Sequence, residues 1–213
     1  MSSSQLSRAT LCPTALLLID IQVGLNVGNG FYGTERSTPD FEANIASLLT
    51  EVRKYNRTSP EVPVVVAHVY HKSSNPESPL YPNSSVHPGG SEFQPVARPD
   101  MASPHESIFS KTKHSAFIST TLESLIRSKN VQQLIIVGIT TDHCVSTTAR
   151  MASDIELVSD GGLVIVSDAT AAFNKVGIDA DMVHRVSLAS LNNEFAQVMN
   201  TRQVLDKLFG PQS

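Results

Sequence analysis

A cysteine at a strand-to-helix junction is the residue of this chain best suited to covalent chemistry. The apolar run from Gln133 to Ile139 predicts a buried parallel strand, and the stretch from Val145 to Ser153 is compatible with a helix. Cys144 lies between them, at the edge of an α/β sheet where ligands bind. The positive end of a helix dipole favours a thiolate, which is the nucleophilic form. Free cysteines are usually small buried hydrophobes, so position alone leaves both interpretations open.

Two further segments contain charged groups that would serve such a nucleophile. The apolar run from Ala15 to Ile19 ends at Asp20, again at the carboxyl end of a predicted strand. A carboxylate there often only caps the next turn. The second segment contains Lys111, and a lysine in such a loop is usually just a solvated charge. Each segment alone is therefore a weak indication.

In this order, the three segments resemble the isochorismatase-like superfamily of cysteine hydrolases. The pattern there is a strand ending in Asp-x-Gln, then Lys-x-x-x-Ser-Ala-Phe, then Gly-(Val/Ile)-x-Thr-x-x-Cys-Val. The corresponding segments here are Asp20 to Gln22, Lys111 to Phe117, and Gly138 to Val145. The resemblance extends over roughly Thr14 to Phe209. Three motifs in the same order, together with this extent, are a more specific signal than chance agreement would give.

The resemblance implies a catalytic triad of Asp20, Lys111 and Cys144, in which Asp20 accepts the thiol proton and Lys111 favours the thiolate. It also implies a cis peptide between Ile139 and Thr140. The backbone N–H groups of Thr140 and Cys144 are candidates for an oxyanion hole. Relatives that cleave the vinyl ether of isochorismate have glycine in place of the cysteine. The retained thiol favours hydrolysis of a small-molecule amide-type C–N bond through a Cys thioester acyl-enzyme.

Two other functions remain open: isochorismate hydrolysis with Asp20 as the acid, and a non-catalytic family member that binds a metabolite. Lys113 competes with Lys111 for the basic role, although the spacing to Ser115 favours Lys111. Asp142 and His143 suggest a Cys-His-Asp triad, but neighbours on a turn point in different directions. We therefore expect His143 to line the pocket rather than to act as the base.

The stretch 72–105 is rich in Pro, Ser, Gly and Asn, and a loop of this length is expected to form a pocket wall. The pattern Gly28-Asn29-Gly30-Phe31-Tyr32-Gly33 matches a dinucleotide fingerprint, but it lies too far after Asp20 and precedes no helix. We interpret it as a loop at the active-site mouth. The side chains expected to line the pocket are Gln22, Phe31, Tyr32, Tyr81, Phe93, Phe117 and His143.

The histidines do not predict a metal site. Some nicotinamidases of the superfamily have an Asp-x-His motif after the second strand, and this chain has none. His68 and His71 are three residues apart at a strand end and do not share one face. His87 and His105 follow further along the chain. We expect neither a metal nor another cofactor.

Alternating apolar and helical segments predict one α/β domain over residues 14–213, after a disordered tail over residues 1–13. The expected fold is a three-layer α/β/α sandwich with a mostly parallel six-stranded sheet, a Rossmann-like arrangement typical of isochorismatase-like hydrolases. The predicted strands are 15–20, 62–69, 107–109, 133–139, 163–166 and 196–199. The predicted helices are 41–55, 121–129, 145–153, 181–193 and 201–208.

Composition narrows the partners to a small-molecule substrate. The net charge is −4 without a basic cluster, which argues against nucleic acid or an anionic membrane. No apolar span is long enough for a bilayer, and the polar N-terminus does not resemble a secretory signal. Two cysteines without a signal sequence favour reduced thiols and a cytoplasmic location. The resemblance implies a homo-oligomer, a dimer or tetramer, with the helix after Cys144 or the stretch 184–195 as the interface.

Overall fold

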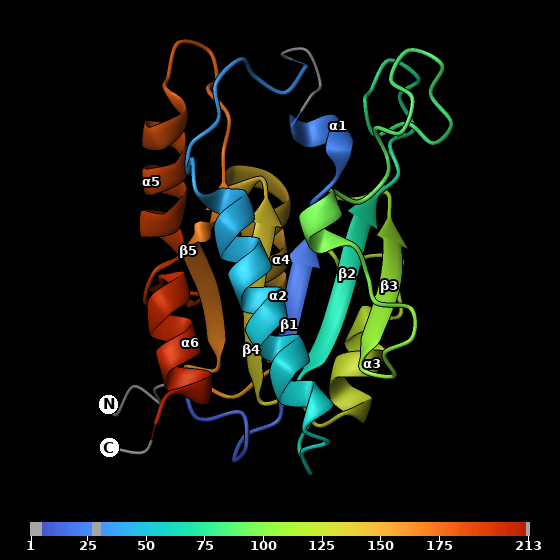
Figure 1. Ribbon diagram of the computed structural model, residues 1–213. Helices are drawn as coiled ribbons and strands as arrows, with labels where there is room; N and C mark the ends of the chain where they lie inside the picture. The colour runs from blue at the N-terminus through green and yellow to red at the C-terminus, as the bar shows by residue number, and fades with distance from the viewer. Residues whose placement is uncertain (1–5, 27–30, 212–213) are drawn as a thin grey trace.

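A parallel six-stranded sheet organises residues 6–26 and 31–211, which are the residues that the computed structural model describes (Figure 1). Its strand order is β3-β2-β1-β4-β5-β6, and every neighbouring pair is parallel. The strands are β1 (Thr14–Ile19), β2 (Val65–His71), β3 (Glu106–Lys111), β4 (Gln133–Ile139), β5 (Leu163–Ala171) and β6 (Gln197–Met199). The predicted sheet is confirmed.

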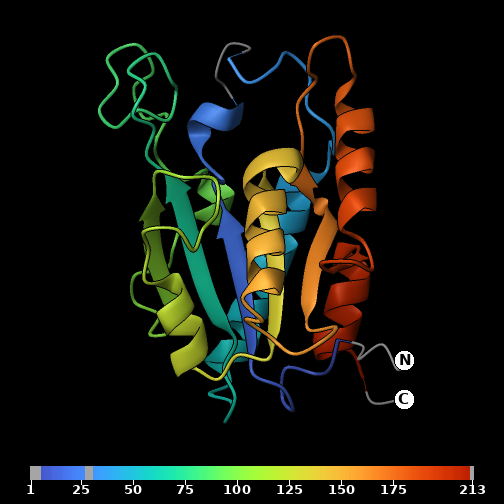
Figure 2. The same cartoon turned by 180° about the vertical axis from the view of Figure 1, so that it is seen from behind.

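Helices cover both faces of this sheet, so the predicted three layers are also confirmed (Figures 1 and 2). One face packs against α2 (Phe41–Arg57) and α6 (Thr201–Phe209), and the other against α3 (Leu122–Ser128), α4 (Ser146–Asp154) and α5 (Ala180–Leu191). Three shorter helical segments are α1 (Val23–Asn26), the 3₁₀ turn η1 (Pro95–Ala97) and the π-helical turn η2 (Thr141–Val145). Over the described part of the chain, no helix is both long and apolar enough to cross a bilayer.

The central strands are buried on both sides, as their uninterrupted apolar sequences require. Every residue of β1 and β4 is buried. Leu16 and Leu18 of β1 pack on the α2 side, whereas Leu17 and Ile19 pack on the α4 side. Strand order reverses between β1 and β4, and ligands bind outside the carboxyl ends of strands at such a switch point. These ends lie at the top of Figure 1.

Gly138 brings β1 and β4 unusually close together at this edge. It pairs with Ile19 and has a φ of +129°. A Cβ at this position would lie 2.0 Å from the backbone oxygen of Ile19, which is far inside van der Waals contact. Both the backbone conformation and the space therefore require glycine. The residue that follows Ile19 is Asp20, so this contact sets the position of its carboxylate.

We expect Gly138→Ala to displace the end of β1 because neither backbone segment has room to yield. The free energy of unfolding should fall by about 2 kcal/mol or more, an ordinary cost for overpacking a core together with an unfavourable φ. Chemical denaturation of the variant beside the wild-type protein measures this loss. Gly177→Ala is a matched control, since its φ is also positive, at +82°, but nothing lies within 4 Å of the added Cβ. Equal losses in the two variants would show that backbone conformation alone, not the contact with Ile19, explains the effect.

The N-terminal segment corrects one prediction. Residues 6–13 are packed against the domain and are not a disordered tail, because Leu6 and Ala9 are buried in the core on the α2 side. The backbone N–H of Ser7 donates to the side chain of Gln133, and Arg8 donates to the carbonyl of Gly210. Two apolar residues thus suffice to anchor a segment that is otherwise polar. Residues 1–5 of the predicted tail lie outside the described residues.

Side chains of one element set the limits of another. Strand β2 begins at Val65 instead of the predicted 62 because the amide of Asn56 binds both the N–H and the C=O of Val64. The helix predicted to start at Val145 is preceded by η2, and α4 itself begins at Ser146. Asp40 precedes α2, but its side chain makes no cap hydrogen bond. Such long-range contacts are absent from local sequence patterns.

A buried ionic cluster joins α2, β2 and β3. Glu106 accepts hydrogen bonds from Arg53 at 2.8 Å, from His68 at 2.9 Å and from the backbone of Asp100 at 2.9 Å. Burial alone would raise the pKa of the Glu106 carboxyl, but these hydrogen bonds lower it from an ordinary 4.5 to about 2. The folded state therefore favours the carboxylate more strongly than the unfolded chain does.

The stabilisation from Glu106 should be complete above pH 4.5 and should disappear as the pH falls towards 2. A pKa change of this size corresponds to about 3 kcal/mol in the free energy of unfolding. Urea denaturation between pH 2 and pH 6 measures it, with Glu106→Gln as the comparison. The variant should be less stable than the wild type at pH 6, and the difference should narrow at low pH. A constant difference would show that the charge of Glu106 contributes nothing.

Candidate active site

The three predicted catalytic residues meet at the carboxyl edge of the sheet. Lys111 Nζ lies 2.6 Å from Asp20 Oδ2 and 3.2 Å from Cys144 Sγ. Asp20 follows β1, Lys111 ends β3 and Cys144 lies in η2 after β4. Asp20 and Lys111 are 1% and 2% exposed, while Cys144 is only partly buried. The arrangement thus places a buried ion pair directly beneath a thiol that has access to the surface.

The π-helical turn that contains Cys144 is held by a buried histidine. Thr141 Oγ1 lies 2.8 Å from Nδ1 of His184, whose Nε2 lies 3.0 Å from the carbonyl of Ser167. Burial lowers the pKa of His184, which favours the neutral ring. Nε2 then donates to the carbonyl, and Nδ1 accepts from the threonine hydroxyl. This chain of bonds fixes η2 to α5 and β5.

The thiol is the favoured form of Cys144 at rest, contrary to the prediction of a dipole-stabilised thiolate. Burial raises the pKa of the Cys144 thiol strongly, and the negative charge of Asp20 raises it further. The cation of Lys111 acts in the opposite direction but does not compensate. Desolvation and one adjacent carboxylate thus outweigh the weak field of a short helical turn.

Lys111 is protonated in this setting. Burial by itself would lower the pKa of its ammonium group, but the charge of Asp20 and the hydrogen bonds to Asp20 and Cys144 raise the pKa above its ordinary value. The carbonyl of Lys113 accepts a further hydrogen bond from Nζ at 3.2 Å, whereas the Lys113 side chain is exposed. Of the two lysines considered for the basic role, Lys111 is the one that contacts Asp20 and Cys144.

His71 is a residue at this site that sequence analysis considered only as a metal ligand. It pairs with Lys111 across β2 and β3, and its Nδ1 lies 3.5 Å from Lys111 Nζ. Burial and the adjacent ammonium group lower the pKa of His71, so the ring is neutral and can accept from Lys111. The signal available in the sequence was its place at the end of a strand beside the catalytic strands.

Gln22 positions the site rather than lining a pocket. Its side chain is fully buried, and Nε2 donates to the carbonyls of His71 and Ser91 at 3.1 and 2.9 Å. Its Oε1 accepts from the backbone N–H of His71 at 2.8 Å. All these bonds are to backbone atoms, so the amide ties the ends of β1 and β2 to the long loop. This corrects the expectation that Gln22 faces the substrate.

The Ser-Ala-Phe part of the second motif docks the Lys111 segment onto α4. The N–H of Ala116 donates to Thr148 Oγ1 at 3.0 Å, and Ser115 Oγ donates to the sulfur of Met151. Phe117 is 6% exposed and belongs to the core beside α4. Its predicted pocket role is therefore a core role. Because α4 continues from η2, these contacts hold Lys111 and Cys144 in fixed relation.

Three buried oxygen atoms at the site lack hydrogen-bond partners within the described ranges: Asp20 Oδ1, Thr140 Oγ1 and Asp142 Oδ1. Buried polar atoms are normally satisfied, so these atoms are available to a bound ligand or a transferred proton. The peptide bond between Ile139 and Thr140 is cis. Asp20 itself has a φ of 51°, a left-handed conformation that is uncommon outside glycine.

Histidines gather at the exposed rim of the site. His114 Nδ1 lies 3.8 Å from Cys144 Sγ, and the ring centroids of His114 and His143 are 5.6 Å apart. Lys175 Nζ lies 3.1 Å from His143 Nε2 and forms an ion pair with Asp142. His143 and Asp142 are thus engaged with Lys175, which agrees with the expectation that His143 is not the base. Sequence analysis did not single out His114.

The aromatic pocket candidates separate into different environments. Burial raises the pKa of Tyr32, and the residue lies close enough to the site that the charge of Asp20 raises this pKa further. Its hydroxyl lies 3.0 Å from Ser78 Oγ in the long loop, and its ring meets that of Phe31, which is partly exposed. Phe93 packs against Tyr70. Tyr81 lies in the loop turn at Ser78.

The long loop is fastened to the end of β1. The backbone N–H groups of Val23 and Gly24 donate to the carbonyls of Glu92 and Gly90, and Gln22 pairs with Phe93 in an antiparallel bridge. This short pairing makes the segment near residue 90 a fixed wall beside Asp20. Among the described residues, no cluster of three or more His, Cys, Asp or Glu side chains is arranged to hold a metal ion. His68 is bound to Glu106, within the sheet.

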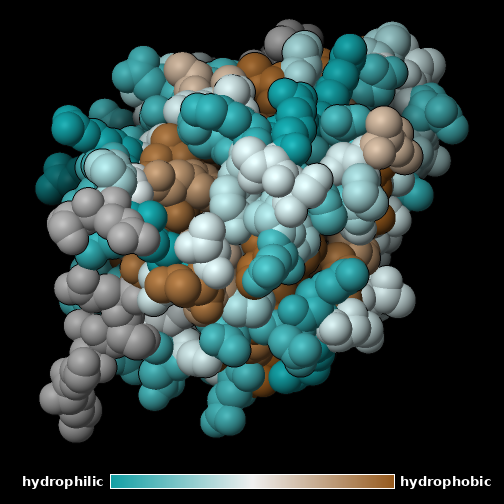
Figure 3. Space-filling model, turned by 60° about the horizontal axis from the view of Figure 1, so that its bottom comes forward, coloured by the Kyte–Doolittle hydropathy of each residue, from teal (hydrophilic) through white to brown (hydrophobic). Residues whose placement is uncertain are grey.

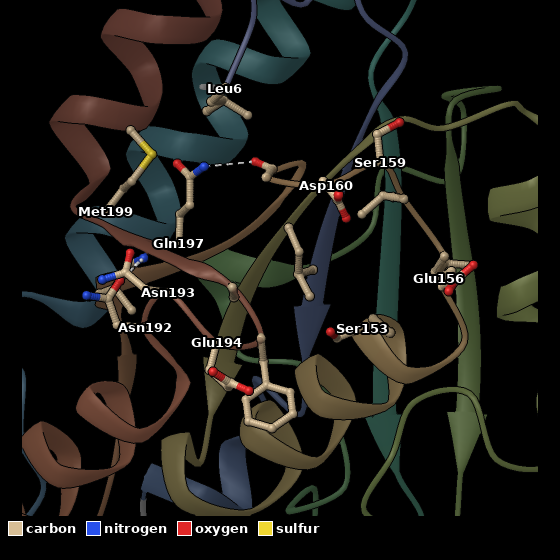
Figure 4. A pocket seen from close by; sticks show the side chains of 18 of the residues that line it. Leu6, Ser153, Glu156, Ser159, Asp160, Asn192, Asn193, Glu194, Gln197 and Met199 are labelled. Carbon is tan, nitrogen blue, oxygen red and sulfur yellow. Dashed lines mark hydrogen bonds between the residues drawn. The ribbon is translucent and has the colours of Figure 1, made fainter. Parts of the chain in front are cut away.

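An open groove of about 1180 Å³ lies at the opposite, amino edge of the sheet. Figure 3 shows this end of the molecule, where small apolar patches interrupt a hydrophilic surface. Figure 4 shows the groove itself, with Gln197 bonded to the carbonyl of Gly161 and with Glu156, Asp160 and Glu194 around it. None of the triad residues lines it, so its size does not make it the site of chemistry.

Comparison with known proteins identifies the family. The model of the isochorismatase domain matches residues 14–203. The isochorismatase family protein YrdC of Bacillus subtilis is 32% identical over 197 residues, which cover 90% of this chain and 94% of YrdC. The crystal structure of an isochorismatase-family protein from Chromobacterium violaceum has 28% identity and a TM-score of 0.78, and covers 97% of both chains.

A shorter match concerns an enzyme of stated activity. The ureidoacrylate amidohydrolase RutB of Variovorax paradoxus is 30% identical over 98 residues, which cover 46% of this chain and 37% of RutB. The family match, by contrast, spans nearly all of the described domain, including every element that positions Asp20, Lys111 and Cys144. The chain belongs to the isochorismatase family of hydrolases.

Proposed function

We propose that this protein is a cysteine hydrolase that cleaves an amide-type C–N bond of a small molecule through a thioester on Cys144. The observation that supports this most directly is the position of Lys111 Nζ, 2.6 Å from Asp20 Oδ2 and 3.2 Å from Cys144 Sγ. A thiol nucleophile needs a base for its proton and a cation near the developing thiolate. The site supplies both within one buried cluster.

In the first step the thiol proton passes to Asp20 as Sγ attacks the carbonyl carbon. The S–C bond forms, the C–N bond breaks, and Asp20 returns the proton to the departing amine or ammonia. Lys111 remains protonated and stabilises negative charge on Sγ and on Asp20 in turn. The backbone N–H groups of Thr140 and Cys144 are our candidates for binding the carbonyl oxygen as it becomes an oxyanion. Water then hydrolyses the thioester and releases the acid.

Small amides and ureides are the substrate class that we propose. The retained cysteine favours acyl transfer over vinyl ether cleavage, and the partial match to RutB is to a ureidoacrylate amidohydrolase. Isochorismate cleavage needs only Asp20 as an acid, and a purely metabolite-binding protein needs none of the three groups. An intact ion pair kept buried beside a thiol is difficult to explain by binding alone, since burying charge is costly.

Replacement of Cys144 by alanine should abolish release of ammonia or amine from a panel of small amides and ureides. We expect a loss of roughly 10⁴-fold, typical for removal of a member of a catalytic triad. Circular dichroism should be unchanged. Cys12→Ala is the matched control. Cys12 precedes β1 at the edge of the sheet opposite Cys144, beside Gln132, and should be dispensable. Isochorismate cleavage that Cys144→Ala retains and Asp20→Asn loses would instead support vinyl ether hydrolysis with Asp20 as the acid.

Asp20→Asn should make Cys144 more reactive while it abolishes turnover. The substitution removes a negative charge that raises the pKa of the thiol and leaves the cation of Lys111, which lowers it. The pH profile of iodoacetamide labelling should therefore move to lower pH. At a fixed pH below the thiol pKa, the labelling rate should rise about tenfold for every pH unit that the profile moves. Peptide mass spectrometry follows both cysteines, and Cys12 is the internal reference. A slower Cys144 in the variant would contradict the assigned charge relation.

We also propose that the chain is a cytoplasmic homo-oligomer. Met182 and Val186 are one helical turn apart on α5 and are exposed, as are Val176 and Ile178 in the preceding turn. Exposed apolar side chains at this spacing support an interface on α5, one of the two segments that we expected to supply one. Light scattering coupled to size-exclusion chromatography should give a dimer or tetramer, and Met182→Glu with Val186→Glu should shift it towards the monomer. A wild-type monomer at micromolar concentration would contradict the proposal.

A further inference from the structure

We propose that His114 is the base that activates water for hydrolysis of the acyl-enzyme. The inference rests on the proposed function, because it concerns the second half of the same reaction. It divides the chemistry between two sides of the sulfur: Asp20 and Lys111 act from the buried side during acylation, and His114 acts from the solvent side during deacylation.

Two side-chain nitrogens of the described residues lie within hydrogen-bonding reach of Cys144 Sγ. One is Lys111 Nζ at 3.2 Å, and the other is His114 Nδ1 at 3.8 Å. The ammonium group of Lys111 remains protonated because Asp20 and Cys144 stabilise its charge, so it cannot accept a proton. Imidazole, in contrast, is the side chain that readily exchanges a proton near neutral pH. Of these two nitrogens, only His114 Nδ1 is able to accept a proton.

Access to water separates His114 from Asp20. Asp20 is 1% exposed, and one of its carboxylate oxygens is bound to Lys111. An acyl group on Sγ would lie between this carboxylate and the surface. His114 is exposed, and its ring lies beside that of His143, which is itself held by Lys175. Water that reaches the thioester from solvent therefore meets His114 first.

The step is balanced without any further reactant. His114 Nδ1 takes a proton from water as the water oxygen bonds to the thioester carbonyl carbon. The C–Sγ bond then breaks, and the acid departs. The proton on Nδ1 passes to the departing sulfur, 3.8 Å away in the resting site, which regenerates both the neutral imidazole and the thiol. General base catalysis requires a base within hydrogen-bonding reach of the proton that it takes, and a position beside Sγ brings His114 close to water that attacks a thioester there.

The test uses 4-nitrophenyl acetate as the probe, because its leaving group needs no proton and so isolates deacylation. Release of nitrophenolate reports acetylation, and intact-protein mass spectrometry reports the acetyl group on Cys144. The acetyl-enzyme is then separated from the probe and its decay is followed. We expect His114→Gln to acetylate at nearly the wild-type rate but to lose the acetyl group about 10²-fold more slowly. His105→Gln is the matched control, since His105 precedes β3 at the opposite edge of the sheet.

Chemical rescue distinguishes a base from a residue that only shapes the pocket. Added imidazole should restore decay of the acetyl-enzyme in His114→Ala and should have little effect on the wild type, because the vacated position is exposed. Equal decay rates in wild type and His114→Gln, or loss without rescue, would overturn the assignment of His114 and leave the proposed function intact. Failure of the wild type to form an acetyl-enzyme on Cys144, or equal nitrophenolate release by Cys144→Ala, would overturn the proposed function itself.

Discussion

The buried ion pair between Lys111 and Asp20 is the interaction on which the rest of the site depends. Both side chains are at least 98% buried, and each would cost several kcal/mol if left without a partner. The pair spans from β3 to β1 across the intervening β2, so three strands must end at the same level. Gly138 sets the level of β1, and the docking of Ser115 and Ala116 on α4 sets that of Lys111. The ends of these strands thus hold Asp20 and Lys111 close enough for their opposite charges to stabilise each other.

The same pair controls the thiol. An isolated cation would lower the pKa of the Cys144 thiol. Here the negative charge of Asp20 opposes that effect, and burial favours the uncharged thiol. In the proposed mechanism, the nucleophile therefore forms only as the proton moves to Asp20. A thiol at rest reacts slowly with oxidants and stray electrophiles, since the thiolate is the reactive species in both reactions. Keeping Cys144 as a thiol thus limits its reactions with molecules other than the substrate.

The sequence predicted the elements that follow from local pattern. β1 and β4 are uninterrupted apolar runs, and a strand buried on both faces has no other sequence form. Asp20 and Cys144 were predictable because each follows such a run, and Lys111 was predictable because it begins an ordered motif. What escaped prediction depends on partners distant in sequence. The amide of Gln22 is bound to backbone atoms 49 and 69 residues away, and Leu6 is buried in a core cluster that also contains Val204 and Leu208 of α6. The ionisation of Cys144 escaped for the same reason, because desolvation is a property of the assembled site.

The antiparallel pairing of residues 22–24 with residues 90–93 has a consequence for how such an enzyme diversifies. Both ends of the long loop are pinned, one at β2 and the other beside Asp20, while its middle returns on itself through local turns at Ser78 and Ser84. Insertions or deletions in that middle portion would alter the shape of the entrance without shifting either anchor. In the proposed enzyme, substrate preference and catalytic geometry are thereby separable. The loop could change under selection for a new metabolite while the positions of Asp20, Lys111 and Cys144 stay the same.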